Sequence, residues 1–268
     1  MRATALMAVN VFRESVRDKV LYNLVFFAVL LIAASYLIGQ LTAGQDIKII
    51  KDLGLAATAV FGLFIAVFIG IGLVSKEVER RSIYALLAKP IQRHQIVLGK
   101  YVGVVLTLAV NLSVMAAAIY FVLGYMRWLA PPGMLEALDA PALDPAMLKA
   151  IALIFVELSI VTAIALFFST FSTPILSATL TFGLFIAGQF SADLRNFDQV
   201  VDSPAAVQLA RALYWVLPNL APFDIKMQVV HGQPVPAEYM ALTIAYGAVY
   251  IAALLTAAVI IFSRRDFK

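Results

Sequence analysis

The segment 76–100 is the most informative part of this sequence, because it concentrates charge in a chain where charge is scarce. Only 13% of the residues are charged, whereas 63% are hydrophobic. Ile83, Leu86 and Leu87 follow an i, i+3, i+4 spacing, which predicts a helix with one apolar face. Pro90 ends this pattern, because proline disfavours helix at the preceding residue and has no N–H to donate. We therefore expect a short amphipathic helix between two apolar runs, suited to docking with a soluble partner.

Charged residues precede the apolar face and complete the expected docking surface. An apolar centre can fill a groove on a partner, and a charged rim sets the register and selects the partner. The positive bias of any cytoplasmic loop would also place some of these charges here. The candidate docking residues are Glu77, Glu79, Arg80, Arg81, Ile83, Leu86, Leu87 and Pro90.

Motifs for catalysis, cofactor binding or metal binding are missing from the sequence. Gly99 and Lys100 are followed by Tyr101 and lack the glycine that a phosphate-cradling loop carries five residues earlier. There is no cysteine, and the two histidines, His94 and His231, fall on opposite sides of the expected topology. We expect no catalytic residue, no cofactor site and no metal site in this chain, so any energy must come from another subunit.

Polar residues inside apolar runs are the remaining candidates for chemistry. Glu157 lies about 12 Å into its run, and an ionisable group at such depth is costly enough to suggest a function. Asn111 and Gln189 lie in neighbouring apolar runs. Two interpretations stay open: these side chains form hydrogen bonds between helices, each worth on the order of 1 kcal/mol, or they line a translocation path.

The elements that position these residues are membrane spans. A soluble domain has about 45–50% apolar residues, well below the 63% found here, and about 20 apolar residues cross the ~30 Å core of a bilayer. The sequence predicts an all-α integral membrane protein that forms a single domain over residues 1–268. The six expected transmembrane helices are at about 21–41, 55–75, 98–125, 149–170, 174–191 and 240–262.

The distribution of basic residues predicts the orientation of these spans. If the N-terminus, the segment 76–100 and the C-terminus share one side, that side holds 13 of the 20 Lys and Arg residues. Cytoplasmic segments carry this excess, so we expect both termini and the segment 76–100 to be cytoplasmic. The net charge of +4 then reflects topology and gives no reason to expect nucleic-acid binding.

Two further helical regions are expected outside the spans. Val9, Phe12 and Val16 share one face of an amphipathic helix before the first span, which would lie on the membrane surface; a solvated basic leader is the alternative.

Between the fifth and sixth spans, the outer segment 192–239 predicts two short helices on the outer face. One occupies about 203–218. The other is capped by Asp224 and continues to Val230, with Gly232 just beyond its end.

Several short features, in chain order, carry a resemblance to a known family. The segments 214–226 (YWVLPNLAPFDIK) and 262–267 (FSRRDF) precede and end the last span. The features of the segment 76–100 are Glu79, a short helix, Leu86-Leu87, Pro90, Arg93 and Gly99-Lys100. Together they resemble the type-2 ATP-binding-cassette (ABC) exporter permeases, and the resemblance covers the whole chain.

This resemblance implies a mechanism and a set of partners. The chain would be the permease subunit of an ABC exporter in the bacterial cytoplasmic (inner) membrane, embedded in the lipid bilayer as a homodimer. A separate cytoplasmic ABC ATPase subunit would bind ATP and Mg and would seat the helix at 76–90 as a coupling helix. The chain itself would not be an enzyme.

Other functions compete with this interpretation. The alternative is a membrane component of an ATPase-driven assembly or maturation complex that acts on an extracytoplasmic accessory protein without classical translocation. A secondary transporter would need paired intramembrane charges or broken helices in two related halves, and the sequence shows neither clearly. Sparse polar residues in the spans would suit a lipid, a hydrophobic drug or a peptide, but they do not identify the substrate.

Overall fold

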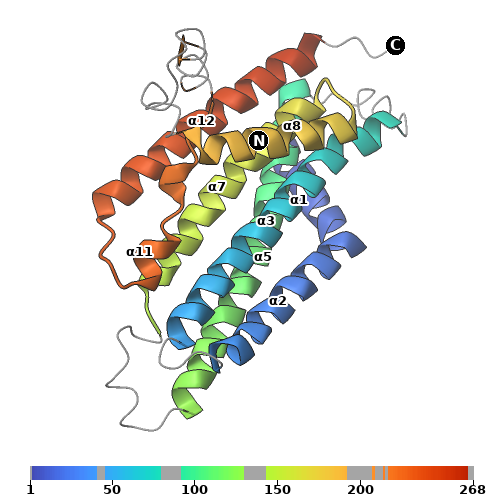
Figure 1. Ribbon diagram of the computed structural model, residues 1–268. Helices are drawn as coiled ribbons and strands as arrows, with labels where there is room; N and C mark the ends of the chain where they lie inside the picture. The colour runs from blue at the N-terminus through green and yellow to red at the C-terminus, as the bar shows by residue number, and fades with distance from the viewer. Residues whose placement is uncertain are drawn as a thin grey trace.

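The protein is a bundle of long helices (Figure 1). The computed structural model describes residues 2–40, 46–79, 92–129, 143–191 and 217–264, together with 207, 208 and 214. Within these ranges every regular element is helical, which confirms the expected all-helical fold. The elements are α1 (Arg2–Val16), α2 (Lys19–Gln40), α3 (Asp46–Glu79), α5 (Arg93–Leu129), α7 (Ala146–Ser169), α8 (Pro174–Gln189), the 3-10 helix η2 (Ala221–Phe223), α11 (Lys226–Val230) and α12 (Ala237–Arg264).

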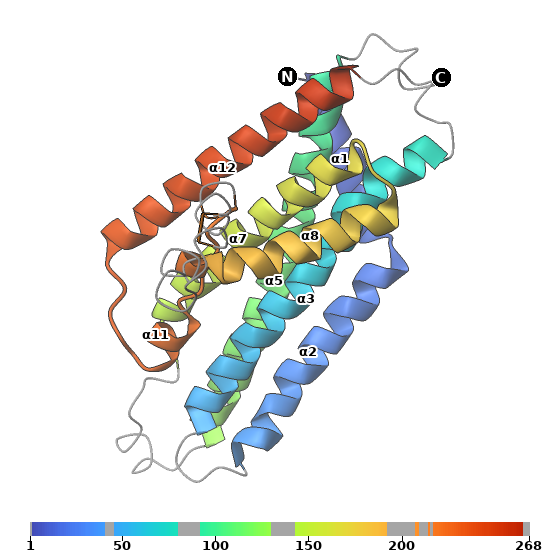
Figure 2. The same cartoon turned by 45° about the horizontal axis from the view of Figure 1, so that its top comes forward.

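All six predicted apolar runs are helical, but they do not have equal length. Among the described residues, α2, α3, α5, α7 and α12 are long and apolar enough to cross a membrane. Helix α8 has only 16 residues, or about 24 Å at 1.5 Å per residue. It is therefore shorter than the expected fifth span and lies obliquely across the bundle (Figure 2).

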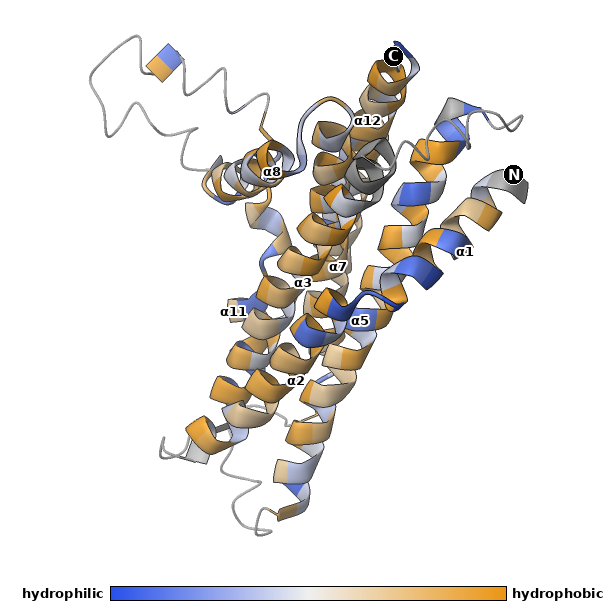
Figure 3. Cartoon of the chain, turned by 90° about the vertical axis from the view of Figure 1, so that its right-hand side faces the viewer, coloured by the Kyte–Doolittle hydropathy of each residue, from blue (hydrophilic) through white to orange (hydrophobic). Residues whose placement is uncertain are grey.

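Helix α7 forms the centre of the bundle. It contacts α3, α5, α8 and α12, and its residues Ile154, Leu158 and Val161 are buried. A helix that is apolar on every face must be surrounded by other apolar elements. The hydropathy colouring agrees: the bundle helices are mostly hydrophobic, and hydrophilic residues gather on α1 and the turn that follows it (Figure 3).

The boundaries of the helices next to the expected docking segment differ from our prediction. We expected a span to end near residue 75 and a separate docking helix to begin at Lys76. Instead α3 continues to Glu79, because residues 73–79 contain no glycine or proline to stop it. Helix α5 then begins at Arg93. The remaining docking residues Arg80, Arg81, Ile83, Leu86, Leu87 and Pro90 lie outside the described residues.

The ends that border this segment lie together in space. The end of α3, the beginning of α5, the beginning of α1 and the end of α12 are all at one end of the bundle (Figures 1 and 2). The opposite end contains the end of α2 and the beginnings of α3 and α7. We name these the inner end and the outer end, after the orientation expected from the basic residues.

The expected N-terminal helix is present as α1, and it packs against α5. Two glycines of α5 spaced four residues apart allow the close approach. A Cβ atom at Gly99 would lie 2.7 Å from the Cβ of Met7, and one at Gly103 would lie 2.5 Å from Cγ1 of Val11. Val9, on the face predicted to lie on the membrane surface, is 44% exposed, whereas Val11 is buried against α5.

The second predicted outer helix is also present. The Asp224 carboxylate accepts a hydrogen bond from the N–H of Lys226 at 3.2 Å, where α11 begins. Gly232 follows the helix with a φ of +68°, a conformation that glycine adopts without strain. The first outer helix, expected at about 203–218, lies almost entirely outside the described residues.

The contact between α1 and α5 leads to a testable prediction. Gly103→Ala places a methyl group where Val11 and the Ala8 carbonyl already lie, so it should destabilise the packing by about 1–3 kcal/mol. Hydrogen exchange of the α1 amides should become faster. Gly124→Ala is the matched control on the same helix, because a Cβ there meets no atom within 4 Å. Equal exchange in both variants would contradict the packing role of Gly103.

Candidate functional site

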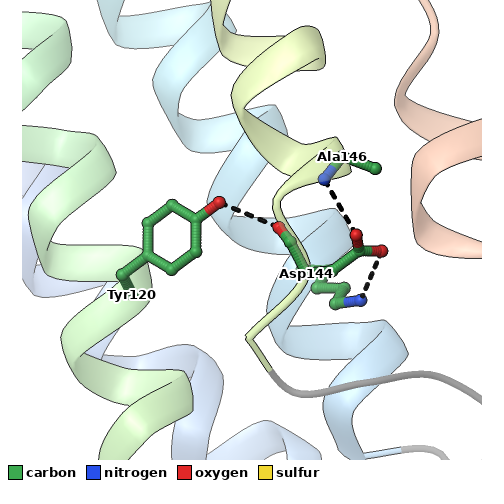
Figure 4. A network of polar contacts seen from close by, with 4 residues as sticks. Tyr120, Asp144 and Ala146 are labelled. Atoms are coloured by element: carbon green, nitrogen blue, oxygen red, sulfur yellow. Dashed lines mark hydrogen bonds and ion pairs between the residues drawn. The ribbon is translucent and has the colours of Figure 1, made fainter.

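A buried ion pair lies at the outer end of the bundle, where three helices meet. Lys51 of α3 is fully buried, and its Nζ lies 3.5 Å from Oδ2 of Asp144, whose side chain is 11% exposed. Asp144 immediately precedes α7. The pair therefore fixes the outer part of α3 to the start of α7 (Figure 4).

Asp144 makes two further hydrogen bonds in the same place. Its Oδ1 accepts from the N–H of Ala146 at 2.8 Å, and its carbonyl oxygen accepts from the Tyr120 hydroxyl of α5 at 2.9 Å. The first bond satisfies a free N–H at the start of α7. The second brings α5 to the same residue, so α3, α5 and α7 all meet at Asp144 (Figure 4).

The surroundings determine what this pair contributes. Two charges in an apolar interior lose their hydration, and their mutual attraction offsets this cost only when further hydrogen bonds satisfy the remaining atoms. The bond from Ala146 supplies part of that compensation. Removing one member of such a pair leaves an uncompensated buried charge, which typically costs about 3–5 kcal/mol.

Our sequence reasoning missed this pair, although both residues carry a signal. Lys51 shares the spacing of Ile47, Gly54 and Leu55, which places it on the buried face of its helix. Asp144 stands directly before a proline, as residues that start helices often do. What the sequence does not reveal is that the two residues, 93 positions apart, are partners.

The structure joins two of the three residues proposed for a translocation path. Glu157, in the middle of α7, is only 5% exposed. Its Oε1 accepts a hydrogen bond from Nε2 of Gln189, at the end of α8, at 2.5 Å. Because α8 is short and oblique, its last residue reaches the middle of α7.

Asn111 is not part of this hydrogen-bonded pair. Its Nδ2 donates to the carbonyl oxygen of Thr107, one turn earlier on α5, at 2.7 Å. A groove of about 530 Å³ between α5 and α7 is lined by small and apolar residues that include Ala109, Ala117 and Phe155. Asn111 does not line it. Within the part of the chain that the structure describes, no group of three His, Asp or Glu residues could hold a metal ion.

The segment before α12 packs against the outer side of the Glu157 site. Leu220 and Phe223 are fully buried, and the N–H of Leu220 donates to the carbonyl oxygen of Gly188 at 3.0 Å. Farther along, Nζ of Lys149 on α7 donates to the carbonyl oxygen of Val235 at 2.9 Å. These bonds hold the segment across the ends of α7 and α8.

Comparison with protein families identifies the chain. A family model described as an ABC-2 family transporter protein matches residues 7–267, nearly the entire sequence. The chain belongs to this family. A search of curated proteins finds no match.

Family membership agrees with the architecture. The ABC-2 protein is a multi-pass membrane component of an ABC transporter, and the family implies a partner ATPase subunit and a lipid bilayer around the helices. The resemblance found in the sequence is thereby confirmed at the level of the family. The candidate docking residues are not tested by this match and stay predictions.

The ion pair of the ABC-2 protein gives a second testable prediction. Lys51→Met should lower the free energy of unfolding by about 3–5 kcal/mol, because Asp144 is left buried and unpaired. The double variant Lys51→Met/Asp144→Asn should lose less than the sum of the two single variants. Unfolding in mild detergent, followed by circular dichroism, measures both effects. Arg127→Met, on an exposed residue near the outer end of α5, is the control; strictly additive losses would show that the pair does not interact.

Proposed function

We propose that this protein is the permease subunit of an ABC exporter in the bacterial inner membrane and that it works as a homodimer. The ATPase subunit docks on the segment 76–90 from the cytoplasm, where both termini also lie. ATP and Mg bind to that subunit. ATP-driven closure of the ATPases moves the docked segment and opens a path between two copies of the permease.

The observation that supports this proposal most is the continuity of α3. This single helix of 34 residues runs from the outer end of the bundle to Glu79, within the first turn of the proposed docking segment 76–90. Helix α5 starts again at Arg93, directly after the segment. A helix transmits displacement along its axis because its backbone hydrogen bonds keep it stiff, so movement of the segment reaches the membrane-embedded parts of both helices.

The packing of α1 supports the same mechanical unit. Its contact with Gly99 and Gly103 lies within three turns of the start of α5. Its exposed side carries the apolar residues Leu6 and Val9 beside the polar Asn10 and Arg13, a mixture that suits the surface of the membrane. The inner end of α5 is therefore braced by α1, which we expect on the membrane surface.

Glu157 and Gln189, with Asn111 from α5, are proposed to border the translocation path. Glu157 and Gln189 contribute polar groups at the level where α8 ends. Their surroundings are apolar, which favours a hydrophobic solute over a highly charged one. The outward direction of transport comes from the resemblance to exporters.

Docking makes a direct prediction. Leu86→Asp/Leu87→Asp places charge on the proposed apolar face. When the permease is expressed together with its neighbouring genes, the ATPase subunit should therefore no longer co-purify with this variant at near 1:1 stoichiometry. Leu129→Asp is the control, since Leu129 is 52% exposed at the outer end of α5. Mass spectrometry of the purified complexes measures the outcome. Retention of the ATPase by the double variant would refute the docking role of the segment 76–90.

The path residues predict a separate effect. Glu157→Gln keeps a group that can bond to Gln189 but removes the carboxylate, so folding should persist while transport falls about tenfold, equivalent to about 1.4 kcal/mol of barrier. ATP-dependent accumulation of a neutral hydrophobic dye in inside-out vesicles measures transport. Glu238→Gln, an exposed residue in the first turn of α12, is the control. Unchanged dye transport by Glu157→Gln would restrict Glu157 to a structural role.

A further inference from the structure

Asp144 is the point where the two helices that flank the docking segment converge. Helix α3 reaches it through Lys51, and α5 reaches it through Tyr120. We propose that this junction is the pivot about which α3 tilts: the outer end of α3 stays fixed to α7 while its inner end moves with the ATPase. This inference rests on the proposed function, and it specifies which end of the helix moves.

The ion pair between Lys51 and Asp144 resists displacement of the outer end of α3. The Lys51 side chain is completely buried, so separating it from Asp144 would leave two charges in an apolar interior. Asp144 is itself fixed, because its side chain bonds to the start of α7 and its carbonyl bonds to Tyr120 (Figure 4). A sliding motion at this level would break several directional contacts together.

Contacts of α3 nearer the inner end are of a different kind. Gly62 lies against Leu158, and Gly70 lies against Ala165, where a Cβ atom would be 3.2 Å from the alanine methyl group. These are close, apolar contacts between a glycine and a small or flexible side chain. Dispersion contacts are individually weak and have little directional preference, so they permit a helix to tilt more readily than an ion pair does.

The geometry of α3 then amplifies motion toward the inner end. Lys51 and Glu79 are separated by about 42 Å along the helix axis. A rigid rod held at one end moves in proportion to the distance from that end. A small tilt about the Asp144 junction therefore displaces Glu79 by several ångströms while positions beside Lys51 stay almost still.

Spin-label distances in the complex with its ATPase test this inference. The sequence contains no cysteine, so labels can be introduced without removing any native residue. The outer pair is Asp52→Cys with Leu148→Cys, and the inner pair is Phe68→Cys with Phe171→Cys; all four positions are exposed. Double electron–electron resonance is recorded on the complex in lipid nanodiscs, without nucleotide and with a non-hydrolysable ATP analogue.

The pivot predicts that the analogue shifts the inner distance by several ångströms and leaves the outer distance unchanged. Equal shifts of both pairs would mean that α3 is displaced as a whole without tilting about Asp144, which overturns the pivot but leaves the proposed function intact. An unchanged inner distance in a complex that hydrolyses ATP also overturns the pivot. Failure of the ATPase to bind the permease overturns the proposed function and this inference together.

Variants of the junction separate a pivot from a merely structural contact. Lys51→Gln should broaden the outer distance distribution in the folded complex and reduce dye transport per ATP hydrolysed. The exchanged pair Lys51→Asp/Asp144→Lys should narrow the distribution again. Arg127→Gln removes an exposed positive charge at the same end and should change neither quantity. An outer distance in folded Lys51→Gln identical to that of the unaltered protein would overturn the proposal.

Discussion

Satisfaction of buried polar groups is the constraint on which this structure depends. In an apolar bundle surrounded by lipid, water cannot compensate an unpaired charge or N–H group. Lys51 therefore needs Asp144, and Asp144 in turn orders the start of α7. Since α7 is the central helix, this one junction sets the position of the element on which the other helices pack.

The surrounding lipid also determines how the helices pack against one another. Lipid tails are as apolar as leucine, so association of spans relies on close van der Waals contact and on interhelical hydrogen bonds. Glycines allow the close contact: α1 packs directly on Gly103, and Leu158 of α7 packs directly on Gly62. Glu157 and Gln189 supply a hydrogen bond between α7 and α8. The bundle thus combines a few directional bonds with many small apolar contacts.

Local patterns in the sequence predicted much of this fold, but they could not predict which residues far apart in the sequence contact each other. The apolar runs and the short helix after Asp224 depend on neighbouring residues, so they could be predicted. The span before the docking segment was ended too early because charge after residue 75 suggested a new element, although residues 76–79 contain no helix breaker and continue α3. Of the candidate site, the sequence indicated Glu157, Gln189 and Asn111 as polar groups within apolar runs, but it did not predict that Glu157 bonds to Gln189 or that Asn111 bonds to its own helix. The partner of Lys51 could not be predicted from spacing.

The short, oblique α8 connects this architecture to transport. A tight turn joins Ser169 to Pro174, so α8 folds back along α7 and ends beside Glu157 instead of reaching the outer surface. The space beyond its end is occupied by the segment that carries Leu220, which bonds to the carbonyl of Gly188. Glu157 is thereby covered on its outer side. In the proposed exporter, access to this residue from outside requires displacement of α8 or of the segment that covers it. Both α8 and α11, the helix that follows this segment, contact α3, so tilting of α3 is the motion best placed to cause that displacement.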